Sequence, residues 1–204
     1  MTQPAPLPPF SPVDRARLYW LKDHGFLRAL WTNFHKLDEE VWRHNHPSPA
    51  RLAWLKANGA ASVLSLRGAT SVPSLIEAAA CADLGLTFRA VEMRAVILPR
   101  REALLGLLDA LHEMPKPMVI HCKSGSDRTG LAATIYLHAF KGVPLPEARN
   151  QLALRYAHNP WGRAKIVNKL LDAYGAAHDG APGATGITFE EWVRTEYDQV
   201  GLMS

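Results

Sequence analysis

Apolar residues from about residue 48 onward recur with the periods of buried strands and amphipathic helices. Short apolar runs predict buried strands, and leucines spaced three and four apart predict an amphipathic helix. Helices and strands alternate, beginning with a helix, over 48–59, 61–66, 74–85, 86–91, 100–114 and 117–121. This alternation is typical of a parallel sheet with crossover helices. We therefore expect an α/β fold in a single domain, with a central, mostly parallel sheet flanked by helices.

The chain after residue 121 is predicted to be mainly helical. Helices are expected over 129–141, 146–156 and 163–174, and a Gly/Pro-rich loop over 179–186. The first of these is apolar nearly all round, which places it in the centre of the domain. Capping-box patterns are formed by Ser74 with Glu77 and by Thr188 with Glu191, and each indicates a helix start.

The N-terminal part of the chain differs in composition from the rest. Residues 1–12 are rich in proline and are expected to be disordered, so the domain is expected to span 13–204. Residues 13–42 are rich in aromatic side chains, with a candidate helix over 14–22. This segment could cover the core, or it could make a peripheral membrane contact.

Composition and charge exclude several classes of protein. The 204 residues are 48% hydrophobic and 21% charged, which is ordinary for a globular domain, and the net charge of +4 suits an anionic ligand. No dense basic stripe accompanies that charge, so we expect no nucleic-acid partner. The two cysteines, Cys81 and Cys122, lack disulfide or zinc-type spacing, and we expect no metal. The absence of a signal peptide and of a membrane-length apolar run favours a cytoplasmic protein.

The strongest chemical signal is the sequence His-Cys-Lys-Ser-Gly-Ser-Asp-Arg-Thr-Gly, which lies between a predicted strand and a predicted helix at 121–130. Backbone N–H groups in such a loop can converge at the positive end of the helix, where they bind a phosphate dianion. The same field lowers the pKa of a cysteine, which makes Cys122 a candidate nucleophile. Arg128 can grip two phosphate oxygens, Thr129 can donate its hydroxyl to the sulfur, and Gly125 permits the turn.

The remaining candidate residues surround this pair. His121 could tune Cys122 through hydrogen bonds or satisfy carbonyl groups of the loop, and Arg67 ends a predicted strand at the sheet edge where α/β proteins bind ligands. The group expected to bind the substrate phosphate comprises Lys123, Ser124, Gly125, Ser126 and Arg128.

These residues give the chain a resemblance to the protein tyrosine/dual-specificity phosphatase superfamily, whose loop is His-Cys, five residues, Arg-Ser/Thr. The resemblance is strongest to a bacterial dual-specificity-like branch, and it extends over roughly 25–200, through segments such as 63–68 and 191–197. It implies a dual-specificity phosphatase-like fold and hydrolysis through a phosphocysteine on Cys122, without a cofactor.

The general acid is less clearly defined, because the region about thirty residues before the cysteine contains no aspartate. Glu92 is the only carboxylate there, and Asp127 lies within the loop itself. The resemblance to branches with an aspartate before the arginine favours Asp127. A neighbouring Arg128 would lower the pKa of that carboxyl, which opposes its use as an acid, whereas a bound phosphate dianion would oppose the lowering.

Several substrates fit the motif. A phosphoprotein, especially one carrying phosphotyrosine, is one expectation. Lys123, the further arginines Arg43, Arg67 and Arg94, and the aromatic segment favour a phosphoinositide or another lipid or inositol phosphate. A phosphate-binding pseudophosphatase is a third possibility, whereas sulfur transfer is disfavoured by the Thr-Gly pair after the arginine.

Overall fold

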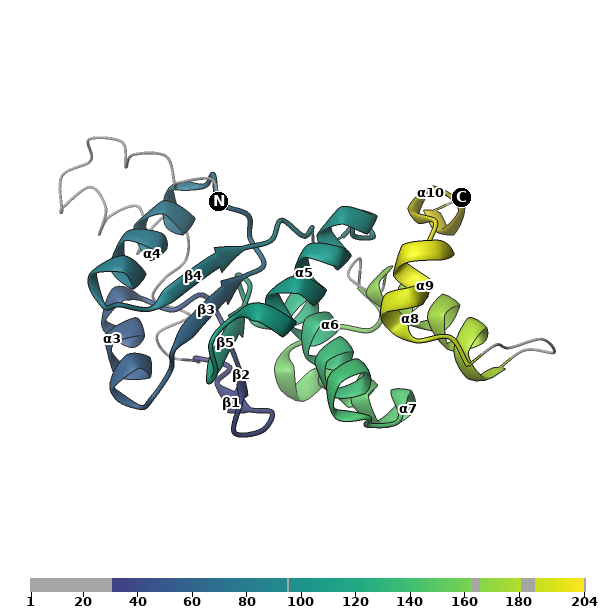
Figure 1. The fold of residues 1–204 in the computed structure, drawn as a ribbon, viewed down its shortest axis with the longest axis horizontal. Coiled ribbons are helices and arrows are strands. Elements are labelled where there is room, and N and C mark those ends of the chain that lie inside the picture. The colour runs from purple at the N-terminus through teal and green to yellow at the C-terminus, as the bar shows by residue number, and fades with distance from the viewer. Residues whose placement is uncertain (1–30, 95, 163–165, 181–185, 204) are drawn as a thin grey trace. The chain divides into compact units, whose positions relative to one another are not determined.

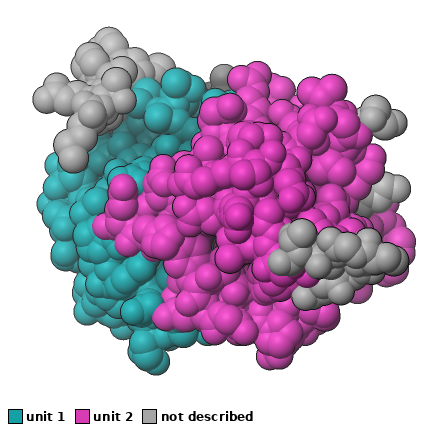
Figure 2. All heavy atoms as spheres, turned by 45° about the vertical axis from the view of Figure 1, so that its right-hand side comes forward, with its two compact units in different colours: residues 1–92, 114–124 teal, residues 93–113, 125–204 magenta. Residues whose placement is uncertain are grey.

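The computed structural model describes residues 31–94, 96–162, 166–180 and 186–203. The Pro-rich segment 1–12, the candidate helix 14–22 and most of the predicted loop 179–186 lie outside these residues. The chain divides into two compact units, coloured in Figure 2: unit 1 comprises 1–92 and 114–124, and unit 2 comprises 93–113 and 125–204.

The five strands found among the described residues belong to unit 1 and form one sheet in the order β1-β2-β5-β3-β4 (Figure 1). The strands are β1 (His35–Lys36), β2 (Val41–His44), β3 (Ser62–Ser65), β4 (Thr87–Ala90) and β5 (Met118–His121). All neighbouring pairs are parallel except β1 with β2. The predicted α/β class with a mostly parallel sheet is confirmed, and β3, β4 and β5 lie where the apolar runs predicted them.

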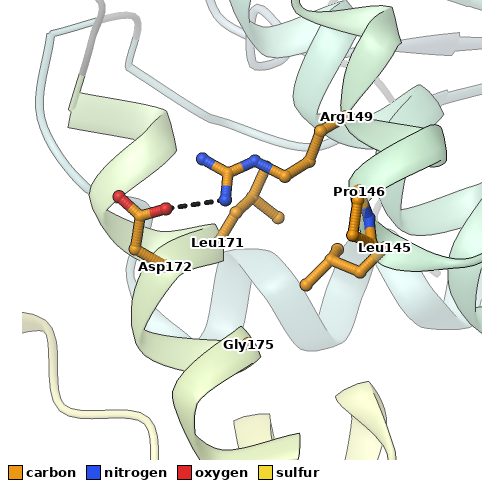
Figure 3. Close-up of a pocket in the computed structure, with 6 residues that line it drawn as sticks. All are labelled: Leu145, Pro146, Arg149, Leu171, Asp172 and Gly175. Atoms are coloured by element: carbon orange, nitrogen blue, oxygen red, sulfur yellow. Dashed lines mark ion pairs between the residues drawn. The ribbon is translucent and has the colours of Figure 1, made fainter. Parts of the chain in front are cut away.

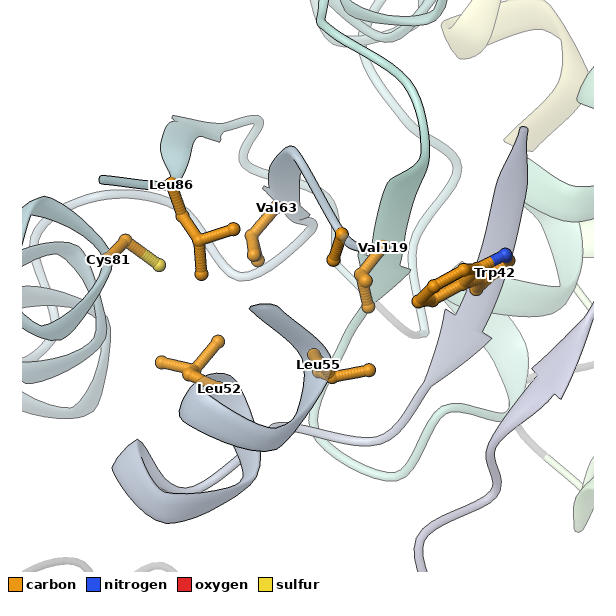
Figure 4. Close-up of a cluster of buried hydrophobic side chains, with 8 residues drawn as sticks. Trp42, Leu52, Leu55, Val63, Cys81, Leu86 and Val119 are labelled. Carbon is orange, nitrogen blue, oxygen red and sulfur yellow. The ribbon is translucent and has the colours of Figure 1, made fainter. Parts of the chain in front are cut away.

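Helices α3 (Pro49–Ala57) and α4 (Val72–Asp83) pack on one face of this sheet. Their apolar side chains meet those of the strands in a cluster, shown in Figure 4, of Trp42, Leu52, Leu55, Ala60, Val63, Cys81, Leu86 and Val119. Every member is at most 5% exposed, so burial of apolar surface holds the helices on the sheet.

The starts of these two helices were predicted with unequal success. Helix α3 begins where the helix over 48–59 was predicted, and Ser48 caps it by accepting a hydrogen bond from the N–H of Arg51. The predicted start of α4 at Ser74 is wrong. Ser71 caps this helix and accepts a hydrogen bond from the N–H of Ser74, so Glu77 is not part of a capping box.

Strand β2 was not predicted, because its second half is polar. Arg43 and His44 are at most 1% exposed although their types favour the surface. His44 Nδ1 lies 2.7 Å from the carbonyl oxygen of Asn45, and its Nε2 accepts a hydrogen bond of 3.0 Å from Arg51 Nε. A carbonyl only accepts, so Nδ1 carries the proton and the ring is neutral.

The neutral state of His44 predicts a pH-dependent stability. Burial, assisted by the charges of Arg51 and His121, lowers the pKa of His44 from 6.5 to about 3. The unfolded chain therefore binds a proton between these values that the folded chain does not. The stability from His44 is complete above pH 6.5 and is lost as the pH falls, by up to about 1.4 kcal/mol per pH unit.

Denaturant unfolding at pH 7 and pH 5 measures this effect. From pH 7 to pH 5, we expect the free energy of unfolding to fall by about 2 kcal/mol less in His44→Gln than in the wild type. His35→Gln, which changes an exposed histidine of the neighbouring strand, should keep the wild-type dependence. Equal pH dependence of the wild type and His44→Gln would show that His44 is not held neutral by the fold.

Unit 2 is helical over its described residues. Its helices are α5 (Arg101–Glu113), α6 (Asp127–Ile135), α7 (Leu145–Ala148), α8 (Ile166–Gly175), α9 (Phe189–Thr195) and α10 (Gln199–Met203). Helix α6 continues as a π-helical turn over Tyr136–Phe140, and it is buried on most sides, as expected for a central helix. Thr188 caps α9 by accepting a hydrogen bond from the N–H of Glu191, which confirms the second capping box.

The predicted single helix over 146–156 is wrong. This segment contains the short α7 and two 3₁₀ turns, Arg149–Gln151 and Leu154–Tyr156. The helix is interrupted by a tertiary contact, because the 3₁₀ turn Arg149–Gln151 packs directly on α6. A Cβ added at Gly130 would lie 2.8 Å from the backbone oxygen of Gln151, so only glycine permits this approach.

The end of unit 2 is anchored to the segment that leads into α5. Tyr197 Oη donates a hydrogen bond of 2.6 Å to the carbonyl oxygen of Pro99, and the side chain of Gln199 donates one to that of Leu98. Arg101 donates to the carbonyl oxygens of Arg194 and Tyr197. Among the helices that the structure describes, none has the length and apolar character required to cross a bilayer.

Candidate active site

The loop predicted to carry the chemistry connects β5 to α6. The boundary between the two units falls inside it, after Ser124. Cys122 directly follows β5, and Asp127, Arg128 and Thr129 form the first turn of α6. The strand and helix on either side of the motif are therefore those that the sequence predicted.

The unit 1 half of the loop has a fixed backbone. Cys122 is 1% exposed, whereas Lys123 and Ser124 are exposed. The carbonyl oxygen of Lys123 accepts a hydrogen bond of 3.2 Å from the N–H of His46, and that of Ser124 accepts one of 3.2 Å from the side-chain amide of Asn33. These bonds orient the carbonyl groups of the two residues that follow the cysteine.

A buried ionisable cluster lies directly before Cys122. His121 Nε2 is 2.7 Å from Glu77 Oε1, and His46 Nδ1 is 3.6 Å from Glu77 Oε2. All three side chains are at most 2% exposed. Burial alone would raise the pKa of the Glu77 carboxyl. The interactions with His121, His46 and Arg67 together outweigh burial, so the pKa lies below its usual value. The sequence had assigned Glu77 to a helix cap.

The same three side chains form the one group of potential metal ligands found among the described residues. Two imidazoles and a carboxylate are a donor set that zinc accepts. The 2.7 Å between His121 Nε2 and Glu77 Oε1 is a hydrogen-bond distance, however, shorter than the roughly 3.3 Å between two ligands of a tetrahedral zinc ion. Within the described residues, neither His121 Nε2 nor the Glu77 carboxylate oxygens have a hydrogen-bond partner of suitable geometry, so the cluster is only a close contact of ionisable groups.

The unit 2 half of the loop supplies glycine, the arginine and the threonine. Gly125 has a φ of 77°, in the left-handed region that glycine favours. Arg128 Nη1 donates a hydrogen bond of 3.1 Å to the carbonyl oxygen of Met93, which fixes the guanidinium. Thr129 is fully buried, and its hydroxyl has no hydrogen-bond partner among the residues described. Ser126, also buried, precedes α6 without capping it through its side chain.

Asp127 has a partner that the sequence did not reveal. His158 Nδ1 lies 2.7 Å from Asp127 Oδ1, and the His158 side chain is completely buried. Its other nitrogen, Nε2, has no hydrogen-bond partner within the described part of the chain. His158 follows Ala157, whose positive φ of 57° is uncommon for a residue other than glycine. The two residues are 31 positions apart, and no local pattern connects them.

The other acid candidate and the outlying arginines have different surroundings. Glu92 is exposed and pairs through its backbone with Arg67, and its side chain packs against Gly68. Arg67 is partly buried and acts electrostatically on Glu77. Arg94 is exposed, whereas Arg43 is completely buried in β2, so Arg43 is not an exposed cation that could contact a substrate.

A pocket within unit 2 contains none of the predicted site residues. It has a volume of about 520 Å³ and is lined by Leu145, Pro146, Arg149, Leu171, Asp172 and Gly175 (Figure 3). Arg149 and Asp172 form an ion pair of 2.6 Å at this pocket, which satisfies both charges within the protein. The pocket therefore provides no evidence for the chemistry of the motif.

The parallel sheet and the motif at the end of its strand β5 define the class of cysteine-dependent phosphatases. The model of the tyrosine phosphatase family matches residues 43–150, more than half of the chain, including the whole loop. The chain belongs to the tyrosine phosphatase family. It is therefore a phosphatase that uses this family's cysteine-based chemistry. Comparison with proteins of curated function finds no match.

Solved structures support the fold. TpbA of P. aeruginosa is 19% identical, with a TM-score of 0.54 over 84% of this chain and 88% of that chain. Tk-PTP in its active form is 21% identical, with a TM-score of 0.55 over 70% and 98%. The core catalytic domain of the PP-IP phosphatase SIW14 from S. cerevisiae is 17% identical, with a TM-score of 0.55 over 74% and 94%. At these identities the likeness concerns the fold.

Proposed function

We propose that the chain hydrolyses phosphomonoesters through a phosphocysteine on Cys122 and acts as a tyrosine or dual-specificity protein phosphatase. The observation that carries this proposal is the family's complete Cys-X5-Arg motif, which directly follows β5 and enters α6. The loop brings a cysteine, a glycine with positive φ and a helix N-terminus together in sequence, as phosphate binding requires.

In the proposed reaction the Cys122 thiolate attacks phosphorus, and the bond between phosphorus and the leaving oxygen breaks. A general acid protonates that oxygen. Water then attacks the phosphocysteine, the S–P bond breaks, and inorganic phosphate leaves with the thiolate restored. Arg128 and the backbone of Lys123, Ser124, Gly125 and Ser126 hold the phosphoryl oxygens, and the Thr129 hydroxyl stabilises the sulfur.

Phosphate release from a panel of substrates tests this function. The panel holds a phosphotyrosine peptide, a phosphoserine peptide, phosphoinositides and an inositol pyrophosphate. Fastest turnover of the phosphotyrosine peptide supports the protein phosphatase. Binding of phosphate without turnover of any member would contradict the proposal and identify a pseudophosphatase.

An inositol or lipid phosphate is the second candidate substrate. Lys123 follows the cysteine directly and is exposed, so its ammonium group could bind a further phosphate of a polyphosphorylated ligand. The fold is also that of SIW14, which is a PP-IP phosphatase. Preference for the inositol members of the panel, lost in Lys123→Met, would favour this candidate over the phosphopeptide.

We assign the role of general acid to Asp127, with His158 as its hydrogen-bond partner. The 2.7 Å contact allows the two side chains to share a proton, whereas Glu92 is exposed and packs against Gly68. General acids typically contribute about 100- to 10,000-fold to rate. We expect Asp127→Asn to reduce kcat by about 100-fold for an alkyl phosphate.

Comparison of leaving groups makes this prediction specific. A nitrophenyl leaving group needs little protonation, so Asp127→Asn should slow hydrolysis of nitrophenyl phosphate much less than that of the alkyl ester. Glu92→Gln is the matched control and should retain wild-type rates on both esters. If Glu92→Gln shows the leaving-group effect instead, the acid is Glu92.

A further inference from the structure

The segment 153–162 is held beside the first turn of α6 by tertiary contacts at and just before it. His158 Nδ1 lies 2.7 Å from Asp127 Oδ1, and the His158 side chain is completely buried. Immediately before the segment, the backbone oxygen of Gln151 lies so close to α6 that a Cβ added at Gly130 would be 2.8 Å from it. Both contacts lie within unit 2, and they place the segment next to the residue assigned as general acid.

The backbone of this segment is a series of tight turns. Leu154–Tyr156 forms a 3₁₀ turn. The side-chain oxygen of Asn159 accepts a hydrogen bond of 3.0 Å from the N–H of Trp161, and its carbonyl oxygen accepts one of 3.1 Å from the N–H of Gly162. These local bonds hold the backbone at Trp161, whose Cα lies at most about 11 Å from that of His158, three residues earlier.

Two large apolar side chains of the segment are left in solvent. Trp161 is 79% exposed and Leu154 is 63% exposed. Tyr156, between them in sequence, is only 7% exposed, so the turns bury one aromatic side chain and present another. A tryptophan at this exposure contributes little to the core, and tryptophan is enriched where proteins bind partners. Single exposed apolar residues are common, but Trp161 stands three residues from the partner of Asp127.

The position of Trp161 favours a peptide as the molecule that it contacts. An extended peptide advances about 3.4 Å per residue, so a side chain two or three positions from the phosphorylated residue lies about 7–10 Å away. That distance is comparable with the reach of the chain from His158 to Trp161, whereas a small phosphate ester is too short to span it. Binding to a membrane surface scales with buried apolar area, and one tryptophan with one leucine offers little of it.

We propose that Trp161 is a specificity-determining residue that binds an apolar side chain, preferably aromatic, two or three positions from the phosphorylated residue of a peptide substrate. This role rests on the proposed function, because it takes Asp127 as the group beside the leaving oxygen of a phosphopeptide. Contact between the indole and the apolar side chain removes both from water. Trp161 thus acts on the binding of the substrate and takes no part in the chemical step.

The kinetics of a series of phosphotyrosine peptides test this role. Each position from three before to three after the phosphotyrosine holds phenylalanine in turn, and the reference peptide has alanine there. We expect phenylalanine at the best position to raise kcat/KM of the wild type by about tenfold, and Trp161→Ala to abolish this gain. Trp161→Phe, which keeps an aromatic ring, should retain most of it. Val200→Ala removes a side chain that is 76% exposed in the same unit and should keep the full gain.

The outcomes separate this role from the proposed function. Because Trp161 is 79% exposed, its removal costs little packing, and the variant should fold. An equal gain from phenylalanine in the wild type and Trp161→Ala, or no gain in the wild type, overturns the role. Loss of binding to phosphatidylserine vesicles in Trp161→Ala, with an unchanged peptide preference, assigns the segment to a membrane instead. If no peptide is hydrolysed, the proposed function fails, and calorimetric binding of the same peptides to Cys122→Ser, with and without Trp161→Ala, still decides whether Trp161 recognises them.

Discussion

Replacement of Cys122 by serine is expected to reduce turnover of every phosphate ester by at least about 10,000-fold, because the nucleophile is removed. A serine hydroxyl is not ionised near neutral pH, and the field of the loop is too weak to deprotonate it. The phosphate-binding groups remain, so the variant should still bind its substrate. Initial rates of phosphate release, together with calorimetric binding of the preferred substrate, measure both effects.

The second cysteine supplies the matched control for this variant. Cys81 lies in the apolar cluster between α4 and the sheet and is completely buried, with a thiol whose pKa burial raises. These properties suit a side chain packed in the core rather than a reactive thiol. Cys81→Ala should therefore keep turnover within a few-fold of the wild type, despite a loss of packing. Residual activity above about a tenth in Cys122→Ser would mean that the nucleophile is another residue.

The elements that the sequence predicted are those whose signals are local. Strands β3, β4 and β5 and helices α3 and α5 are encoded by apolar runs or by apolar repeats within a few residues. Strand β2 was missed since Arg43 and His44 are polar, and their burial depends on partners distant in sequence. The broken helix after α7 was missed for a similar reason, because the packing of Gly130 against Gln151 is tertiary.

The candidate site shows the same division. The motif was visible because phosphate binding needs a cysteine, a glycine and an arginine within a few residues, so its chemistry is local. The residues that orient the motif are not. Glu77 lies 44 positions before His121, and His158 lies 31 positions after Asp127. Glu77 also satisfied a capping-box pattern with Ser74, and only the position of Ser71 as the true cap removed that interpretation.

The arginine of the motif gives the second large effect. We expect Arg128→Lys to lower kcat/KM by about 100- to 1,000-fold, although the charge is conserved. The planar guanidinium donates Nη1–H to the carbonyl oxygen of Met93 at 3.1 Å, which fixes its plane, and its fork can bind two phosphoryl oxygens at once. A lysine ammonium cannot reproduce this fixed, two-point geometry, so it loses stabilisation of the charge that develops on the phosphoryl group.

Steady-state kinetics with the preferred substrate of the panel measure this loss. Arg94→Lys changes an exposed arginine of the same unit and should stay within about threefold of the wild type, which separates the geometry of Arg128 from a general effect of basic residues. Met93→Ala should have little effect, because the acceptor for Arg128 is a backbone carbonyl that any residue supplies. Near-wild-type kcat/KM in Arg128→Lys would indicate that charge alone suffices and that Arg128 does not grip the phosphate in two places.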